Sequence, residues 1–456
     1  MDSGIQAPYP MLHHNKTPSL PFLAVFVLSF AGFTQAFAVT TKNAATQLGN
    51  WRFKSSMEAR VGLQHGTGLN FGLGAIDDIR DTERTNLAIS LEPALNVERD
   101  LALGVVFANL SIVGAANLLE GELSGQFARS GDSRLDHDVA QVGWRNESIE
   151  FSVGPQNFVV GDGLIIGDGN FDLGSEQGQF WVAPFDAWKN AAVLKIQQQY
   201  VRGEVFWLAS DGGFGDARLG GFNIENTSTE LGRFGAMYIN VYGGNALGYD
   251  GTEAFNLRAL GVPFPWLPAL KFFSEIVWQF GEDEDGDFQN VDALGWYLET
   301  AYTLDKLPWT TVFTYRYSRF SGDDLSTPDV EGYRSLFYGF YAREWDTFYQ
   351  GEIAGEYHLF NSNQVTQFLK IRTFPTEKFA LTVYYYQHDL DTRQYYGTPL
   401  STRDWADEVN AGVEYFGEHA YVYAGIAWST PNDGAKEAFG SDENFTVVQT
   451  WMSFHF

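Results

Sequence analysis

The feature that most constrains this chain is a two-residue alternation of polar and apolar side chains, which recurs along most of its length. In the last segment, Phe445–Phe456, the face that holds Met452 and Phe454 becomes apolar, and the opposite face becomes polar. Such alternation is typical of a strand with one dry and one wet side. A chain that stops on such a strand has an unpaired edge, which pairing with the first strand would remove. The alternation therefore predicts a closed antiparallel sheet, with the last strand of a soluble β-sandwich as the alternative.

Eighteen segments show this alternation, and no convincing amphipathic helix lies between them. Many are near the roughly 9–11 residues that a tilted strand needs to cross the hydrocarbon of a membrane. Short turns such as Asn146–Ser148 separate them from long Gly- and Asp-rich loops such as Phe158–Asn190, as in outer-membrane barrels. The segments are Phe53–Gln64, Asn86–Val97, Leu101–Ser111, Asp138–Arg145, Ile149–Asn157, Ala191–Tyr200, Arg202–Ala209, Arg233–Tyr242, Ala254–Val262, Leu270–Phe280, Asp292–Leu304, Trp309–Arg319, Gln350–Phe360, Val365–Thr373, Lys378–His388, Glu408–Phe416, Ala420–Ser429 and Phe445–Phe456.

Two further stretches, Gly220–Glu225 and Tyr333–Ala342, lie inside predicted loops and are candidate strands of their own. The fold class predicted is therefore all-β: a transmembrane antiparallel β-barrel of about 18 strands, with 16 or 20 as alternatives.

The N-terminus reads as a targeting segment rather than as part of this fold. The apolar run Phe22–Phe33 follows the basic residue Lys16 and is too short to span a bilayer as a helix. Ala36-Phe37-Ala38 is a small-x-small cleavage site. We therefore predict a signal peptide over residues 1–38 and an outer-membrane barrel over residues 39–456, with an N-terminal membrane anchor as the alternative.

The composition narrows the functional classes. The 22 Tyr, 13 Trp and 38 Phe suit aromatic girdles at two membrane interfaces. A net charge of −28 excludes nucleic acid as a partner, because nucleic-acid binding needs a basic surface. The chain has no Cys, and no metal site or cofactor is predicted. The acidic run Glu282–Asp287 offers hard oxygens, so weak divalent-cation binding at acidic loops is the one exception considered.

Lys and Arg residues occupy one face of several predicted strands. A charged side chain on the lipid face near mid-membrane costs about 2–4 kcal/mol, so these faces should point into the lumen. We expect Arg316 and Arg372 to contribute most to a modest anion preference; the alternative is that the charges only neutralise one another and stabilise the wall. The predicted pore-lining residues are Arg52, Lys54, Arg60, Lys195, Arg202, Arg258, Arg316, Lys370 and Arg372.

One stretch resembles a known family. Val153–Gly167 is similar to the Gly-x-Gln…Gly-Asp-Gly…Ile-Gly motif of the alginate-export family of outer-membrane β-barrel porins, and Pro184–Trp188 to the element that follows it. Phe360–Asn363 and Pro375–Leu381 are also like elements of these barrels. The resemblance implies a monomeric barrel of about 18 strands that exports or admits anionic polysaccharide through an arginine-rich constriction.

The loop Phe158–Asn190 is unusually long and aromatic, and long structured loops are usually functional. Because exposed aromatic side chains would be costly in water, we expect this loop to fold into the barrel mouth as a constriction. The alternative is that it packs over the rim. The predicted constriction residues are Asp162, Asp168, Phe171, Trp181, Phe185, Asp186 and Trp188.

These features predict a channel of the bacterial outer membrane that passes or exports a hydrophilic solute, such as an anionic polysaccharide or oligosaccharide. The chain has only 8 His and no Gly-x-Ser-x-Gly elbow, so an enzyme is not expected. A structural or receptor-type barrel and a carbohydrate-active enzyme are the alternatives. Expected partners are outer-membrane lipid and lipopolysaccharide, a periplasmic export partner, and the barrel-assembly machinery, for which the terminal Phe456 resembles the recognition signal. A monomer is expected.

Overall fold

The structure is a computed structural model that describes residues 45–456, apart from 125–127, 168, 170–181, 183–185, 213–214, 228–229, 244–248, 284–288 and 340–349. The predicted signal peptide lies outside the described residues. All described residues belong to one unit, Asn43–Phe456.

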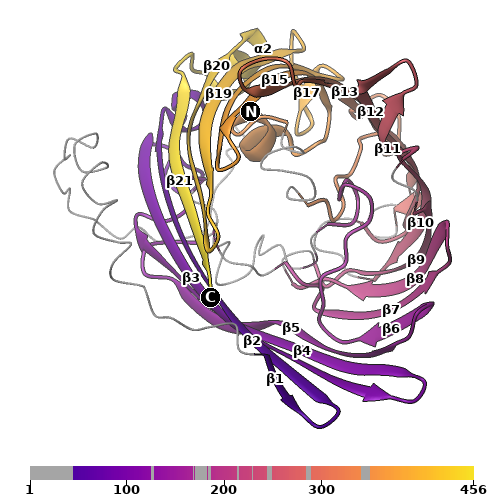
Figure 1. Cartoon of the computed structure of the whole chain (residues 1–456). Helices are drawn as coiled ribbons and strands as arrows, with labels where there is room; N and C mark the ends of the chain where they lie inside the picture. Colours follow the sequence, from indigo (N-terminus) through magenta and orange to yellow (C-terminus); the bar gives the residue numbers. More distant parts are fainter. Residues whose placement is uncertain are drawn as a thin grey trace. The chain divides into compact units, whose positions relative to one another are not determined.

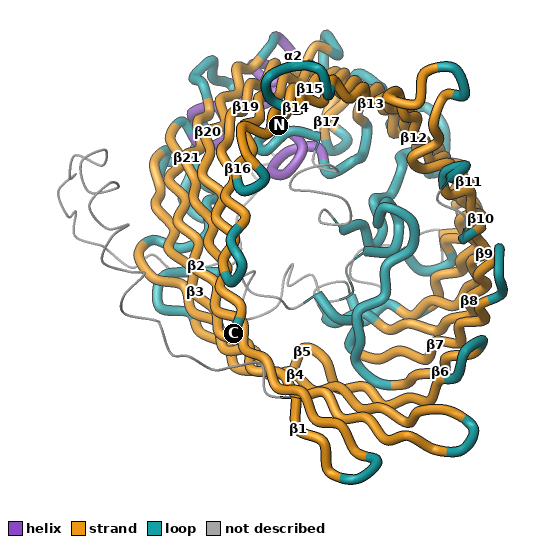
Figure 2. The backbone as a smooth tube through the Cα atoms, viewed as in Figure 1, coloured by secondary structure: helices purple, strands orange, loops and turns teal. Residues whose placement is uncertain are grey.

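That unit is a closed antiparallel β-barrel of 18 strands, as the alternation predicts (Figures 1 and 2). Each strand pairs with its neighbours along the chain, and β21 pairs back onto β2. The barrel strands are β2 (Trp51–Thr67), β3 (Glu83–Leu101), β4 (Gly104–Leu119), β5 (Ser133–Arg145), β6 (Ile149–Val153), β7 (Asn190–Gln197), β8 (Val201–Ala209), β9 (Arg218–Asn226), β10 (Arg233–Tyr242), β11 (Thr252–Phe264), β12 (Leu267–Asp283), β13 (Gln289–Leu304), β14 (Thr310–Phe320), β15 (Gln364–Thr376), β16 (Phe379–Leu390), β19 (Asp404–Phe416), β20 (Ala420–Pro431) and β21 (Phe445–His455).

Few elements lie outside the barrel wall. A short strand, β1 (Ala45–Leu48), pairs with β2 at its start, and β17 (Gln394–Tyr395) and β18 (Thr398–Pro399) form a small hairpin in a loop. The helical pieces among the described residues are η1 (Leu69–Gly72), η2 (Ala354–Leu359) and α2 (Asp433–Phe439). None of the helices in the described part of the chain is long and apolar enough to cross a membrane.

The end of the chain closes the barrel. The backbone N–H of Phe456 donates to the carbonyl of Met57 at 2.9 Å, and that of Met57 donates to the carbonyl of Phe456 at 3.0 Å. Alternation along β21 puts Phe456 on the outward face with Phe454, whereas Gln449 faces inward and bonds to Gln64. Closure satisfies the backbone groups of the last strand, which lipid could not do.

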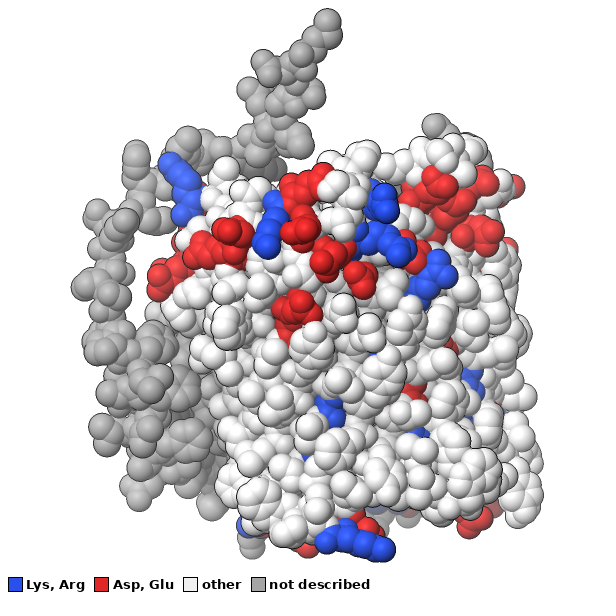
Figure 3. Space-filling view, turned by 90° about the horizontal axis from the view of Figure 1, so that it is seen from above, with Lys and Arg blue, Asp and Glu red and all other residues white. Residues whose placement is uncertain are grey.

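The two faces of the wall differ in chemistry. Large apolar side chains such as Leu91, Val142, Leu369 and Val383 are exposed on the outward face. In the side view, the Lys, Arg, Asp and Glu side chains gather mainly at the two ends of the wall and leave a broad band between them largely uncharged (Figure 3). A wall of this kind suits a hydrocarbon layer bounded by water on both sides.

The strand count of 18 is confirmed, but one predicted strand does not form, and one strand forms inside a predicted loop. Gln350–Phe360 was predicted as a strand and instead contains the π-helix η2. Its alternation is real, but Gly351 has a positive φ of 100° and the segment turns out of the wall. The missed strand is β9, around the candidate Gly220–Glu225, where the absence of a side chain at Gly221 leaves room for the ring of Phe206 on β8. Among the described residues 333–339, no strand forms.

Candidate functional site

All nine predicted pore-lining cations lie on the inward face of the wall. The inward direction is set by Tyr297 and Glu275, which contact the Asp162 loop that lies inside the ring of strands (Figure 2). Strand register carries this direction around the barrel: Arg258 lies opposite Glu275, and Arg316 opposite Glu299, two residues along β13 from Tyr297. The same register, followed through β15, β16 and β19–β21, places the cations of β15 and β2 on this face.

Most of these cations are paired with carboxylates on the same strand, on a neighbouring strand or on the next strand but one. At least seven of the nine form ion pairs, so the inner wall is charged but largely neutralised. Lys54 is exposed, and no described residue forms an ion pair with it. Lys370 is buried over the ring of Phe368, with 5.9 Å between its Nζ and the ring centroid. The pairs are Arg52–Glu98, Arg60–Glu58, Lys195–Glu150, Arg202–Glu225, Arg258–Glu225, Arg316–Glu299 and Arg372–Glu414.

The nine cations differ strongly in access to solvent. Arg258, Arg316 and Lys370 are buried, and the guanidinium of Arg316 lies 4.6 Å from the Phe368 ring centroid. The partly exposed ones, such as Arg52 and Lys195, lie near the ends of their strands that the short turns join. A passing solute would therefore meet the cations at that end of the lumen more readily than the buried ones.

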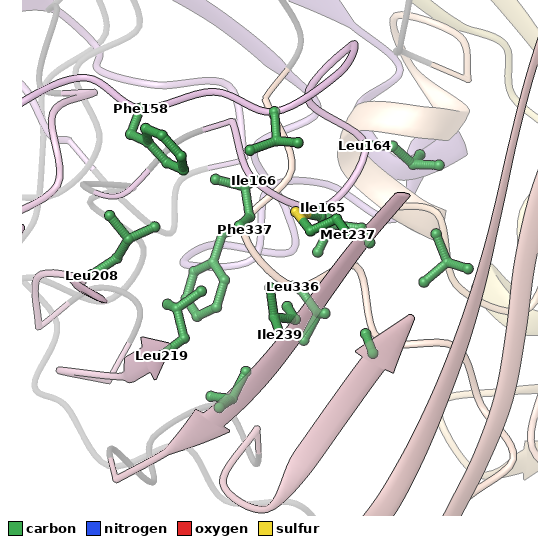
Figure 4. Packing of buried hydrophobic residues seen from close by; sticks show 14 of the residues in the cluster. Phe158, Leu164, Ile165, Ile166, Leu208, Leu219, Met237, Ile239, Leu336 and Phe337 are labelled. Carbon is green, nitrogen blue, oxygen red and sulfur yellow. The ribbon is translucent and has the colours of Figure 1, made fainter. Parts of the chain in front are cut away.

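The first part of the long loop between β6 and β7 packs against the inner wall. Phe158 and Leu164–Ile166 are buried with Leu208, Leu219 and Ile239 of β8–β10 in one apolar cluster (Figure 4). Inward-facing strand positions are apolar here because the loop, rather than water, covers them. The loop thus narrows the space enclosed by this half of the barrel.

A buried polar network holds the tip of this loop. The hydroxyl of Tyr297 donates to Asp162 at 3.1 Å, and the backbone N–H of Asp162 donates to Glu275 at 3.4 Å. Asn256 donates to Glu275 at 3.0 Å and accepts a bond from Arg258, also at 3.0 Å. Asp162 therefore serves to anchor the loop to β12 and β13.

A second long loop, between β14 and β15, packs against the first, a contact that the sequence did not predict. Gly167 donates to the carbonyl of Phe337 at 2.7 Å, Phe337 donates to Ile165 at 3.1 Å, and Gly339 donates to Gly163 at 2.9 Å. A Cβ at Gly167 would lie 2.3 Å from the backbone nitrogen of Gly339, so this approach requires glycine. The two loops are thereby joined into one body.

The remaining predicted constriction residues divide into two groups. Trp188 is fully buried, donates from its indole to the carbonyl of Phe158 at 3.1 Å, and packs on Phe337 with 5.2 Å between ring centroids. Asp186 is half-buried near Arg60, and desolvation raises its pKa while the charge of Arg60 opposes the shift. Asp168, Phe171, Trp181 and Phe185 lie outside the described residues.

The described part of the chain contains no group of three or more His, Cys, Asp or Glu residues that could hold a metal ion. Most of the acidic run that was considered for Ca²⁺ lies outside that part, and Asp283 at its start pairs with Arg334.

Comparison with known proteins places the fold in the class of outer-membrane β-barrels. No family model and no curated protein matches the sequence. The chain is similar in structure to the outer membrane protein opdK of Pseudomonas aeruginosa, with a TM-score of 0.54 and 10% identity over 88% of this chain and 98% of that one. OccAB3 of Acinetobacter baumannii gives 0.55 and 11% over 89% and 99%, and OpdO of P. aeruginosa 0.54 and 14% over 89% and 97%. Likeness at this identity shows the fold alone, and the resemblance to the alginate-export family gains no support from it.

Proposed function

We propose that this protein is a channel of the bacterial outer membrane for a hydrophilic solute. The observation that carries the proposal is the division of the wall: apolar side chains lie on the outward face, and nine Lys and Arg residues, most of them paired with carboxylates, lie on the inward face. A closed barrel of 18 strands is wide enough to hold an aqueous path beside inward-folded loops, as barrels of 16–18 strands do.

For the solute, we propose an acidic oligosaccharide. The support is the group of solvent-accessible cations at one end of the lumen: Arg52, Lys54, Lys195 and Arg202. Barrels of this class have their short turns on the periplasmic side, so this group would lie at the periplasmic mouth. Because most of these cations already pair with carboxylates, the preference for anions should be modest.

Planar-bilayer recording with the refolded protein tests both the channel function and the preference for an acidic solute. We expect discrete conductance steps and, in a KCl gradient, a reversal potential that indicates slight anion selectivity. A short oligouronate should interrupt the current more often than a neutral oligosaccharide of the same length, and Lys54→Gln should reduce this difference. Equal block by both sugars would exclude the acidic solute but leave the channel standing. A correctly folded barrel with no conductance would favour a structural or receptor role.

A further inference from the structure

Besides the two long loops, the helix η2 also lies within the ring of strands, beside β16–β21 (Figures 1 and 2). Its segment packs with Leu69, Phe71, Trp405 and Phe445 in a second apolar cluster. The segment is bounded by backbone in the left-handed region, at Gly351 before it and at Phe360 after it. A short π-helix between two such residues depends on its docking contacts, because it has little intrinsic stability.

The start of η2 is held by a carboxylate of the wall. Glu408 on β19 is fully buried and accepts the backbone N–H of Ala354 at 2.9 Å and that of Ile353 at 3.2 Å. Asn410 donates to the same carboxylate at 2.9 Å. These are the orphan N–H groups at a helix start, which favour a negative charge, so Glu408 is suited to docking η2 as a carboxylate.

Two further carboxyls meet at this contact. The carboxyls of Glu352, just before η2, and Glu356, within it, lie close enough to share a hydrogen bond, and Gln449 on β21 donates to Glu352 at 2.6 Å. A hydrogen bond between two carboxyl groups needs a proton on one of them, because two carboxylates offer only acceptors. The Oε2 atom of Glu356 is buried with no partner of its own. The docked arrangement therefore contains a bound proton.

Within the part of the chain that the structure describes, the two carboxyls have no ion-pair partner. None of the Lys and Arg residues in the described part of the chain forms an ion pair with Glu352, Glu356 or Glu408. Arg84 donates to the backbone carbonyl of Glu122, but its ion pairs are with Asp77 and Asp81. Both His residues nearby keep a buried ring nitrogen without a partner. The groups on neighbouring elements are Glu122 of the β4–β5 loop, Asn70 of η1, His358 of η2, His388 of β16, Glu408 of β19, Gln449 of β21, Tyr395 of β17, and Lys436 and Glu437, which are exposed on α2.

These contacts set the direction of the pH effect. Burial, and the charge of Glu408, raise the pKa of Glu352 to about 7 although the bond from Gln449 opposes the shift. Burial and the charge of Glu352 raise the pKa of Glu356 well above that of a free glutamate. Burial lowers the pKa of His358 to about 3, so this ring stays neutral and supplies no charge. Because the docked carboxyls hold protons that free glutamates would lose, docking is strongest at acid pH and weakens as the pH rises through about 7.

We propose that η2 is a proton-controlled gate: it stays docked on the wall while Glu352 and Glu356 hold their shared proton, and it is released into the lumen when the pair loses it. The ligand of this site is the proton itself. The effect on solute flow rests on the proposed channel function, whereas the release of η2 does not.

Thiol labelling tests the release directly, because the native chain has no Cys. Leu359→Cys puts one thiol in the buried end of η2, and Asp442→Cys, in an exposed loop, gives the reference that corrects for thiolate formation. One proton bound with a pKa of about 7 predicts that the corrected labelling rate rises at least about tenfold from pH 6 to pH 8. Glu356→Gln, which keeps a hydrogen-bond donor at all pH values, should abolish most of this rise, and the exposed control Glu418→Gln should leave it unchanged.

A flat corrected rate in the wild-type background, or an unchanged rise with Glu356→Gln, would overturn the proposal. Hydrogen exchange of backbone amides 353–360 in the full-length protein, with and without Glu356→Gln, gives the same test if Leu359→Cys does not fold. Single-channel recording tests the effect on the channel. Closures of the wild-type channel should be more frequent at pH 8 than at pH 6, whereas closures of the Glu356→Gln channel should be equally frequent at both pH values. A pH-dependent labelling rate with pH-independent closures would reject the gate but leave the channel intact.

Discussion

Glu225 on β9 forms ion pairs with two arginines that differ in burial, which gives a matched pair of substitutions. The Nη2 atom of Arg258 lies 2.9 Å from Glu225, and its side chain is 1% exposed. The Nη2 atom of Arg202 lies 2.7 Å from the same carboxylate, but its side chain is 34% exposed. Both arginines share this carboxylate, although Arg202 also forms an ion pair with Glu204 and Arg258 also donates to Asn256, so the comparison contrasts a partly exposed ion pair with a buried one.

We expect Arg258→Met to lower the free energy of unfolding by about 3–5 kcal/mol, because it leaves Glu225 and Glu275 buried with less compensating charge. Asn256 would lose a hydrogen bond as well. Arg202→Met should cost only about 0–1 kcal/mol, because water screens the partly exposed guanidinium of Arg202 and because Arg258 still compensates the charge of Glu225. Adding Glu225→Gln to Arg258→Met should recover part of the lost free energy of unfolding, because it removes one buried carboxylate that Arg258 no longer compensates.

Urea unfolding in phospholipid vesicles, followed by Trp fluorescence, measures these differences. Protease cleavage near Asp162 provides a second readout, because Arg258→Met should also loosen the loop that this network anchors. Equal losses for the two Arg variants would refute the reasoning, and so would a loss below about 1 kcal/mol for Arg258→Met, since both would mean that burial does not govern the strength of these pairs.

Three other substitutions test separate parts of the barrel. Gly167→Ala should cost about 1–3 kcal/mol, because its Cβ would meet backbone of the opposing loop, whereas Gly203→Ala, which meets nothing within 4 Å, should stay within about 0.5 kcal/mol; both are read from urea midpoints. Deleting Phe456 should lower the yield of folded, heat-modifiable barrel, because the closing strand loses its last pairing with β2, and unchanged insertion would contradict this. Arg316→Ser with Arg372→Ser should shift the reversal potential in a salt gradient toward cations, because two inward carboxylates lose their partners; unaltered selectivity would assign these arginines to wall stability.

The sequence by itself determined the type of wall. Lipid penalises charge at every outward position and closure requires every strand to have two neighbours, so the two-residue alternation predicts both a barrel and the direction of its cations. The terminal segment through Phe456 could be identified as the closing strand for the same reason. The predicted total of 18 strands was correct, although it counted Gln350–Phe360, which forms no strand, and did not count β9.

Tertiary structure alone decided what fills the barrel. Alternation states which side a residue faces but not what packs against it, so the sequence could not show that Arg258 is buried beneath a loop while Arg202 is not. The contact between Gly167 and Gly339 and the docking of η2 on Glu408 join residues that are far apart in the chain, and backbone N–H groups donate the hydrogen bonds in both. Such contacts leave no periodic trace in a sequence, because they depend on how two loops meet in space rather than on the repeat of either one.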